Sequence, residues 1–121
     1  MRPLNLIAYD VLNSRWTTVD SVDFKHRMLH DFGSEFKGNP TYIVDFKLVA
    51  STEVLDMDGN MIYEGDILEI EYNKETIKRE TVILKSGAYV LKSNNYHLSY
   101  VVHKAKIVDH ILGKRPIFGK D

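Results

Sequence analysis

A period-two alternation of apolar and polar side chains in short segments most constrains the fold of this chain. Between residues 67 and 72 the sequence Ile-Leu-Glu-Ile-Glu-Tyr places both glutamates on one side and the leucine, second isoleucine and tyrosine on the other. Successive side chains of a strand point to opposite faces, so this pattern is typical of a half-buried strand. We therefore expect a sheet with one face packed on a core and the other in water.

Strand-forming residues dominate the rest of the chain, and turn residues separate the segments that carry them. The expected strands are Leu4–Tyr9, Arg15–Val19, Thr41–Val49, Asp66–Tyr72, Arg79–Lys85, Ala88–Lys92 and Ala105–Leu112. The turn residues at 58–60 (Asp-Gly-Asn) and 86–87 (Ser-Gly) predict hairpin connections. The exception is Phe24–Phe32, where apolar residues recur at helical spacing and predict one short helix.

These elements predict a mostly β fold with one short helix, built from coiled antiparallel sheets. The strands, tight turn and irregular segment of the C-terminal half follow the order of a small SH3-like barrel, an interpretation by analogy because unrelated meanders read alike. The length of 121 residues is that of one compact domain. We expect a single domain over residues 1–121, with strands and the short helix in 1–50 and the SH3-like barrel portion in 51–113.

The composition is that of an ordinary globular protein, with 44% hydrophobic and 27% charged residues. No apolar run reaches the length of a membrane span, and the start lacks the apolar stretch of a signal peptide. The absence of cysteine excludes disulfides and thiolate chemistry and fits a reducing compartment. We expect a cytoplasmic protein with no membrane partner.

An Asp-x-Asp-x-Asn spacing at Asp56, Asp58 and Asn60 resembles the beginning of a calcium loop, in which alternate oxygens surround a hard cation. The match fails further along the chain. Met61 stands where the loop needs a glycine, and Ile67 stands where it needs a bidentate carboxylate. The segment is therefore interpreted as an acidic hairpin turn.

Two other polar groups have the residue types of a reactive site. His26 and His30 would share one face of the predicted helix, but two nitrogens fall short of the usual three protein ligands of zinc. Glu64 and Asp66 flank Gly65 and could act as an acid and base pair, although a glycine between them favours a turn. Phosphate loops, nucleophile elbows and dinucleotide fingerprints are missing. We expect no catalytic residue, metal ligand or cofactor, and a protein that is not an enzyme.

Charge is unevenly distributed along the chain. Residues 41–75 carry two basic and nine acidic side chains, whereas residues 76–121 carry nine basic and three acidic ones. Basic and aromatic residues of the last third form a candidate binding surface: Lys78, Arg79, Lys85, Lys92, Lys104, Lys106, Tyr89 and Tyr96. Such residues can follow a phosphate backbone and stack bases. Alternatively, these strands pair with the acidic segment and their charges cancel across the sheet.

A motif at residues 56–68 reads Asp-Met-Asp-Gly-Asn-Met-Ile-Tyr-Glu-Gly-Asp-Ile-Leu. It resembles the Asp-x-x-Gly-x-x-Ile-Tyr-Glu-Gly-Asp-Ile signature of the YopX family of phage and prophage proteins. The segment around Ile-Ala-Tyr-Asp at 7–10, followed by Trp16, is similar to the opening of that family. The resemblance implies a phage-encoded, largely β protein and carries no established reaction. We interpret the central part as a structural motif formed by Asp58, Gly59, Ile62, Tyr63, Glu64, Gly65 and Asp66.

These observations favour a phage or prophage accessory protein that acts by binding a protein rather than by catalysis. The partner would be a phage protein, or a host factor that the chain inhibits, such as a CRISPR-type defence nuclease. A second copy of the chain is a further possible partner, giving a homo-oligomer. The alternative is a small-barrel module that binds nucleic acid through the basic C-terminal third, which the net charge of −1 makes the weaker hypothesis.

Overall fold

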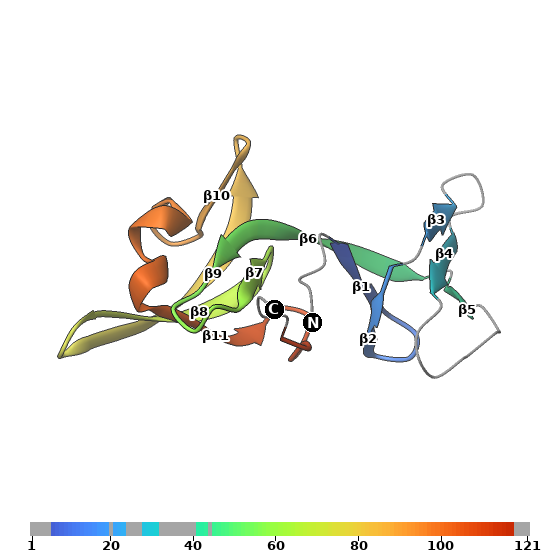
Figure 1. The fold of residues 1–121 in the computed structure, drawn as a ribbon, viewed down its shortest axis with the longest axis horizontal. Coiled ribbons are helices and arrows are strands. Elements are labelled where there is room, and N and C mark those ends of the chain that lie inside the picture. Colours follow the sequence, from blue (N-terminus) through green and yellow to red (C-terminus); the bar gives the residue numbers. More distant parts are fainter. Residues whose placement is uncertain (1–5, 20, 24–27, 32–40, 44, 118–121) are drawn as a thin grey trace. The chain divides into compact units, whose positions relative to one another are not determined.

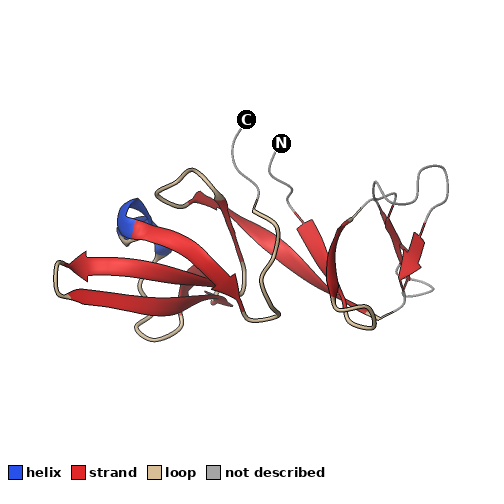
Figure 2. Ribbon diagram, turned by 90° about the horizontal axis from the view of Figure 1, so that it is seen from below, coloured by secondary structure: helices blue, strands red, loops and turns tan. Residues whose placement is uncertain are grey.

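The structure is a computed structural model that describes residues 6–19, 21–23, 28–31, 41–43 and 45–117. Strands make up most of this part of the chain (Figure 2). The backbone forms two compact units that meet in sequence between Val49 and Ala50. Among the described residues, none of the helical segments has the length and apolar character needed to cross a bilayer.

The N-terminal unit is built from short antiparallel strands. Its strands are β1 (Leu6–Asp10), β2 (Arg15–Thr18), β3 (Ser21–Asp23), β4 (Met28–Asp31), β5 (Thr41–Ile43) and the start of β6 (Phe46–Leu55). Strands β1 and β2 form a hairpin, and β3, β4 and β5 form a three-stranded sheet in that order (Figure 1). Ala8 is fully buried and packs against Val19 and Phe46. Tyr9 and Trp16 pair across the hairpin with ring centroids 5.1 Å apart.

The helix predicted over Phe24–Phe32 is wrong at Met28–Asp31. These four residues form β4, which is hydrogen-bonded to β3 on one side and to β5 on the other. Residues 24–27 and 32 lie outside the described part. An isolated helix of nine residues is marginal in water, whereas pairing on both edges gives the same backbone groups partners. The sheet context therefore outweighs the helical spacing of the apolar residues.

The C-terminal unit contains the remainder of β6 and all later elements. These are β7 (Met61–Tyr63), β8 (Asp66–Asn73), β9 (Thr76–Lys85), β10 (Ala88–Leu91), the 3-10 turns η2 (Leu98–Tyr100) and η3 (Val102–Lys104), and β11 (Ala105–His110). The last four strands form an antiparallel sheet in the order β10-β9-β8-β11, and β7 pairs with β6. Both predicted hairpins are confirmed. Ser86 and Gly87 adopt positive φ angles of 52° and 81°, as a two-residue hairpin requires.

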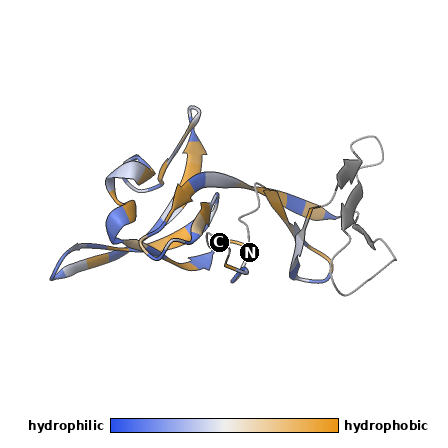
Figure 3. Cartoon of the chain, viewed as in Figure 1, coloured by the Kyte–Doolittle hydropathy of each residue, from blue (hydrophilic) through white to orange (hydrophobic). Residues whose placement is uncertain are grey.

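The core of this unit lies on one face of its long strands. Along β8 the burial alternates as the sequence predicts, and Leu68 and Ile70 are inaccessible to solvent. Hydrophobic and hydrophilic bands alternate along these ribbons (Figure 3). The buried cluster consists of Ile62, Leu68, Ile70, Val82, Leu91, Leu98, Val101 and Ala105. The mostly β, antiparallel fold class is thus confirmed, with one sheet curled into a half-barrel. The SH3-like topology stays a prediction.

Candidate functional site

Asp56 organises the turn between β6 and β7, where the sequence resembles a calcium loop. Its Oδ1 accepts hydrogen bonds from the backbone nitrogens of Asp58 and Asn60, each at 2.9 Å. Its Oδ2 accepts one from the backbone nitrogen of Ile107 at 3.1 Å. Asp56 is buried, and both oxygens of its carboxylate accept hydrogen bonds from backbone nitrogens. This geometry supports the interpretation of the segment as a hairpin turn.

Gly65 turns the chain between β7 and β8 and packs directly on His110. Its φ of +87° lies in the left-handed region, and a Cβ atom built there would lie 2.7 Å from His110 Nε2. The buried imidazole is held at both nitrogens. Nδ1 accepts from the backbone nitrogen of Leu112 at 3.0 Å, so Nε2 carries the proton and donates to the Glu64 carbonyl at 2.8 Å. Burial lowers the pKa of His110, which favours this neutral form.

Asp66 forms a buried ion pair with Arg115. The carboxylate is inaccessible to solvent and the Arg115 side chain is 1% exposed. Arg115 donates from Nε to Asp66 Oδ1 at 2.7 Å and from a terminal nitrogen to Oδ2, while the backbone nitrogen of Tyr63 donates to Oδ2 at 2.7 Å. The guanidinium also lies 4.5 Å from the centre of the Tyr63 ring. Asp66 is therefore engaged inside the fold with Arg115 and Tyr63, and its carboxylate presents no surface to solvent.

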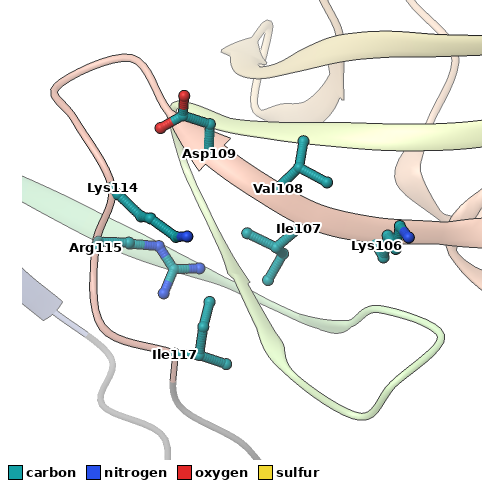
Figure 4. Close-up of a pocket in the computed structure, with 7 residues that line it drawn as sticks. All are labelled: Lys106, Ile107, Val108, Asp109, Lys114, Arg115 and Ile117. Carbon is teal, nitrogen blue, oxygen red and sulfur yellow. The ribbon is translucent and has the colours of Figure 1, made fainter.

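A shallow pocket of about 320 Å³ lies beside this ion pair, along β11 and the segment that follows it. Figure 4 shows Lys114 and Arg115 extending from that segment toward Ile107 on β11. The lining residues are Lys106, Ile107, Val108, Asp109, Lys114, Arg115 and Ile117. The Arg115 guanidinium at this pocket is already engaged with Asp66.

Two cations of the predicted binding surface lie near the same acidic residue on β8. Arg79 and Lys106 stand directly opposite Glu69 on the two strands that flank β8. Arg79 Nε lies 3.9 Å from one Glu69 carboxylate oxygen, and Lys106 Nζ lies 3.7 Å from the other. Opposite charges in this register attract across the sheet. The structure thus supports cross-strand charge pairing for Arg79 and Lys106.

The rest of the predicted surface is divided among other places. Burial, together with the charges of Glu64 and Glu53, raises the pKa of Tyr89, which places this tyrosine in an acidic environment. Lys85 donates from Nζ to Asn95 Oδ1 at 3.2 Å. Lys78 on β9 and Lys92 after β10 are exposed, and Tyr96 and Lys104 lie together at a second pocket. The eight residues therefore do not all serve one site.

This second pocket, the tyrosine pocket, is lined by Tyr72, Tyr96, Tyr100, Val101 and Lys104 and has a volume of about 330 Å³. The position of the pocket follows from the packing of neighbouring residues into the core. Leu98 and Val101, three residues apart, are buried and anchor the η2 turn, so that Tyr100 between them points outward and is 70% exposed. Tyr72 extends the inward-facing row of β8 beyond Ile70 and packs at the margin of the core. Tyr96 is 52% exposed.

Two polar groups of the tyrosine pocket have unmet bonding capacity. The Tyr72 hydroxyl oxygen is buried and has no hydrogen-bond partner among the described residues. Lys104 Nζ lies 5.3 Å from the centre of the Tyr72 ring. No carboxylate in the described part of the chain forms an ion pair with Lys104, in contrast to Lys106 two residues later. The pocket thus combines the rings of three tyrosines, of which Tyr72 has a buried hydroxyl without a partner, with one cation.

Sequence reasoning placed Tyr96 and Lys104 in its candidate surface and missed Tyr72 and the anchoring of Tyr100. The spacing of Leu98 and Val101 is the local signal that would have indicated an outward-facing Tyr100. No local signal marks Arg115 or His110, because their partners lie far away in sequence.

The histidines do not assemble with carboxylates into a metal site within the part of the chain that the structure describes. His97 and His103 are exposed, and His110 is committed to the backbone contacts given above. The sequence also offered two histidines as zinc ligands. Of these, His26 and the side chain of His30 lie outside the part of the chain that the structure describes.

The fold and these sites define a small antiparallel β protein whose central motif builds structure and whose surface carries an aromatic pocket. A model of the YopX protein family matches residues 8–112, so the chain belongs to that family. Membership suggests a phage-type protein. Comparison with curated proteins and with solved structures gives no match.

Proposed function

We propose that this chain is a phage- or prophage-encoded accessory protein that works in the bacterial cytoplasm by binding another protein, without catalysis. The observation that carries the proposal is the tyrosine pocket. Tyrosine is enriched at protein interfaces because its ring contributes a large apolar area and its hydroxyl a polar contact. Tyr96 and Tyr100 expose 52% and 70% of their surface in a chain that also has a cluster of buried hydrophobic residues. An exposed aromatic pocket of this kind is characteristic of a binding surface.

The surroundings of the central motif support a binding role over an enzymatic one. A catalytic carboxylate needs an oxygen that can reach a substrate. Asp56 directs its carboxylate to backbone donors, and Asp66 directs its carboxylate to Arg115 and the Tyr63 backbone. Both side chains are buried. The motif is better suited to holding the turns of the sheet together.

Charge supports a protein partner over nucleic acid. From Ala50 to the end, the sequence has ten basic and eleven acidic residues, so the excess of bases in the last third is offset within this part of the chain. Arg79 and Lys106 share Glu69, and Arg115 is paired with Asp66. Affinity for a phosphate backbone grows with the number of cations available to neutralise it. Three of the ten bases are thus engaged with carboxylates inside the fold.

A host factor that the protein inhibits, such as a defence nuclease, is the partner class we propose, with a second copy of the chain as the alternative. The test is a pull-down from the bacterial host with the unaltered chain, Tyr100→Ala and Leu84→Ser. Leu84 is 52% exposed on β9 and does not line the tyrosine pocket, which makes it the matched control.

Wild-type chain and Leu84→Ser should retain the same partner, and Tyr100→Ala should lose it by tenfold or more, as expected for an aromatic hot spot worth about 2 kcal/mol. Light scattering on the purified chain separates self-association from a host partner. Failure to recover any partner, together with a lone monomer, refutes the proposal. Tight binding of short nucleic acids with a steep salt dependence would instead favour the alternative function.

A further inference from the structure

We propose that the tyrosine pocket receives a single aromatic side chain from an acidic segment of its partner. This inference rests on the proposed function and adds the chemistry of the occupant. Three observations carry it: the apolar walls, the unpartnered Tyr72 hydroxyl and the unpaired Lys104 ammonium.

The walls of the tyrosine pocket determine which kind of partner side chain fits it. Tyr72, Tyr96 and Tyr100 offer ring surfaces, and Val101 contributes an aliphatic patch. A volume of about 330 Å³ is at the lower limit of ligand pockets and suits one bulky side chain better than an extended ligand. Aromatic rings gain from stacking or edge-to-face contact with other rings beyond the burial of area. An aromatic anchor therefore uses these walls better than an aliphatic one.

The Tyr72 hydroxyl is the polar contact that we assign to the occupant, which reaches this buried oxygen only by displacing the atoms that now close it off from solvent. A buried hydroxyl without a hydrogen-bond partner destabilises the free protein, and this penalty is removed when a ligand provides the missing bond. A hydroxyl can donate or accept, so it can meet an indole N–H, a phenol or a backbone carbonyl of the occupant. The affinity of the occupant is thereby linked to one oxygen atom that is present in tyrosine and absent from phenylalanine.

Lys104 determines the charge of the flanking residues. Its ammonium group lies over the Tyr72 ring without an acidic partner among the described residues. Lys106 and Arg79 differ from Lys104 in having an acidic neighbour, since they lie 3.7 Å and 3.9 Å from the Glu69 carboxylate. A carboxylate next to the aromatic anchor would pair with Lys104, whereas a basic neighbour would be repelled. The occupant is therefore an acidic segment.

The test uses the full chain and three short capped peptides as probes. The first has a tryptophan between two glutamates, the second a tryptophan between two lysines, and the third an alanine between two glutamates. Binding is followed by NMR, from the ring resonances of Tyr72, Tyr96 and Tyr100. The acidic tryptophan peptide should bind at least about tenfold more tightly than either other peptide.

Three variants assign this preference to the pocket. Tyr72→Phe should keep its fold and lose about tenfold in affinity for the acidic tryptophan peptide, because only the hydroxyl is removed. Lys104→Gln should reduce the difference between the acidic and basic peptides, and Lys92→Gln, an exposed lysine outside the pocket, should leave it unchanged.

Equal binding of the acidic and basic peptides, or unchanged binding by Tyr72→Phe, would overturn the inference. Tighter binding of a thymidine dinucleotide than of any peptide would assign the pocket to nucleic acid instead. If Tyr100→Ala loses the host partner while none of the peptides binds, the inference fails and the proposed function survives. If the acidic peptide binds, no host partner is captured and light scattering finds a lone monomer, the proposed function fails and the occupant chemistry stands.

Discussion

Replacement of Gly65 by alanine should strongly destabilise the C-terminal unit, for two reasons that add. The φ of +87° is unfavourable for any residue with a Cβ atom by about 1–2 kcal/mol. The new Cβ would also lie 2.7 Å from His110 Nε2 and 2.8 Å from Cε1, distances that side chains do not adopt. The ring cannot move aside without breaking its bonds to the Glu64 carbonyl and the Leu112 nitrogen, so overpacking adds about 1–3 kcal/mol. The expected loss is about 2–5 kcal/mol.

Gly87→Ala is the matched control. Gly87 has a similar φ of +81°, and no atom outside its neighbours lies within 4 Å of the Cβ position. Its loss should be limited to backbone strain of about 1–2 kcal/mol. The two variants therefore differ in the contacts of the new Cβ, which at residue 65 meets His110 and, at 3.1 Å, Ile111 Cγ1.

The assay is urea unfolding, followed by NMR through the amide signals of β8 and β9. It gives for each variant the urea concentration at which half of the protein is unfolded. Gly65→Ala should lose more stability than Gly87→Ala, and part of the difference should return in the double variant Gly65→Ala, His110→Ala, compared with His110→Ala alone. Equal losses for the two glycine variants, or no coupling between Gly65 and His110, would refute the steric reasoning.

Three further predictions concern buried polar groups. Asp66→Asn leaves Arg115 buried without its charge partner and should cost about 3–5 kcal/mol in urea unfolding; a loss below 1 kcal/mol would mean that the pair is not buried in solution. Asp56→Ala removes the acceptor of three backbone donors and should cost about 2–4 kcal/mol, whereas the exposed Asp58→Ala should change stability by less than about 0.5 kcal/mol. The lowered pKa of His110 means that its contribution to stability is fully present above the usual value of 6.5 and is lost as pH falls from 6.5 through the folded-state pKa. NMR titration of the His110 ring should therefore give a midpoint below 6.5, and a midpoint above it would contradict the assignment of a desolvated neutral ring.

The sequence predicted those parts of the fold that depend on local patterns. Alternation located β8 at Asp66–Asn73 almost residue for residue, and the Ser86–Gly87 dipeptide located the turn between β9 and β10. The prediction from sequence failed at Met28–Asp31. There the helical spacing of apolar residues competed with strand pairing, and that pairing is seen only when the neighbouring β3 and β5 are known. Local signals thus identify elements, and partners distant in sequence decide between competing structures.

The candidate site was less predictable because it depends on which face the core occupies. Arg115 reads in the sequence as one more base of the C-terminal third, and its partner Asp66 lies 49 positions earlier. Tyr96 and Lys104 were identified by residue type alone, but their neighbour Tyr72 comes from a different strand. Composition could indicate an aromatic and basic surface. It could not distinguish the cations that pair within the fold from Lys104, which has no acidic partner among the described residues.

The hydrogen bond from Ile107 to Asp56 joins residues 51 positions apart and bears on the order of folding. Ala105 adds a second link, since its carbonyl accepts the backbone nitrogen of Met57. The turn of the family motif can therefore reach its final form only after the last strand has docked, and such long-range closure slows folding. During synthesis the motif leaves the ribosome well before its partner strand does. Completion of this hairpin should accordingly be a late event, and a nascent chain halted before residue 105 would still present Asp56 to water.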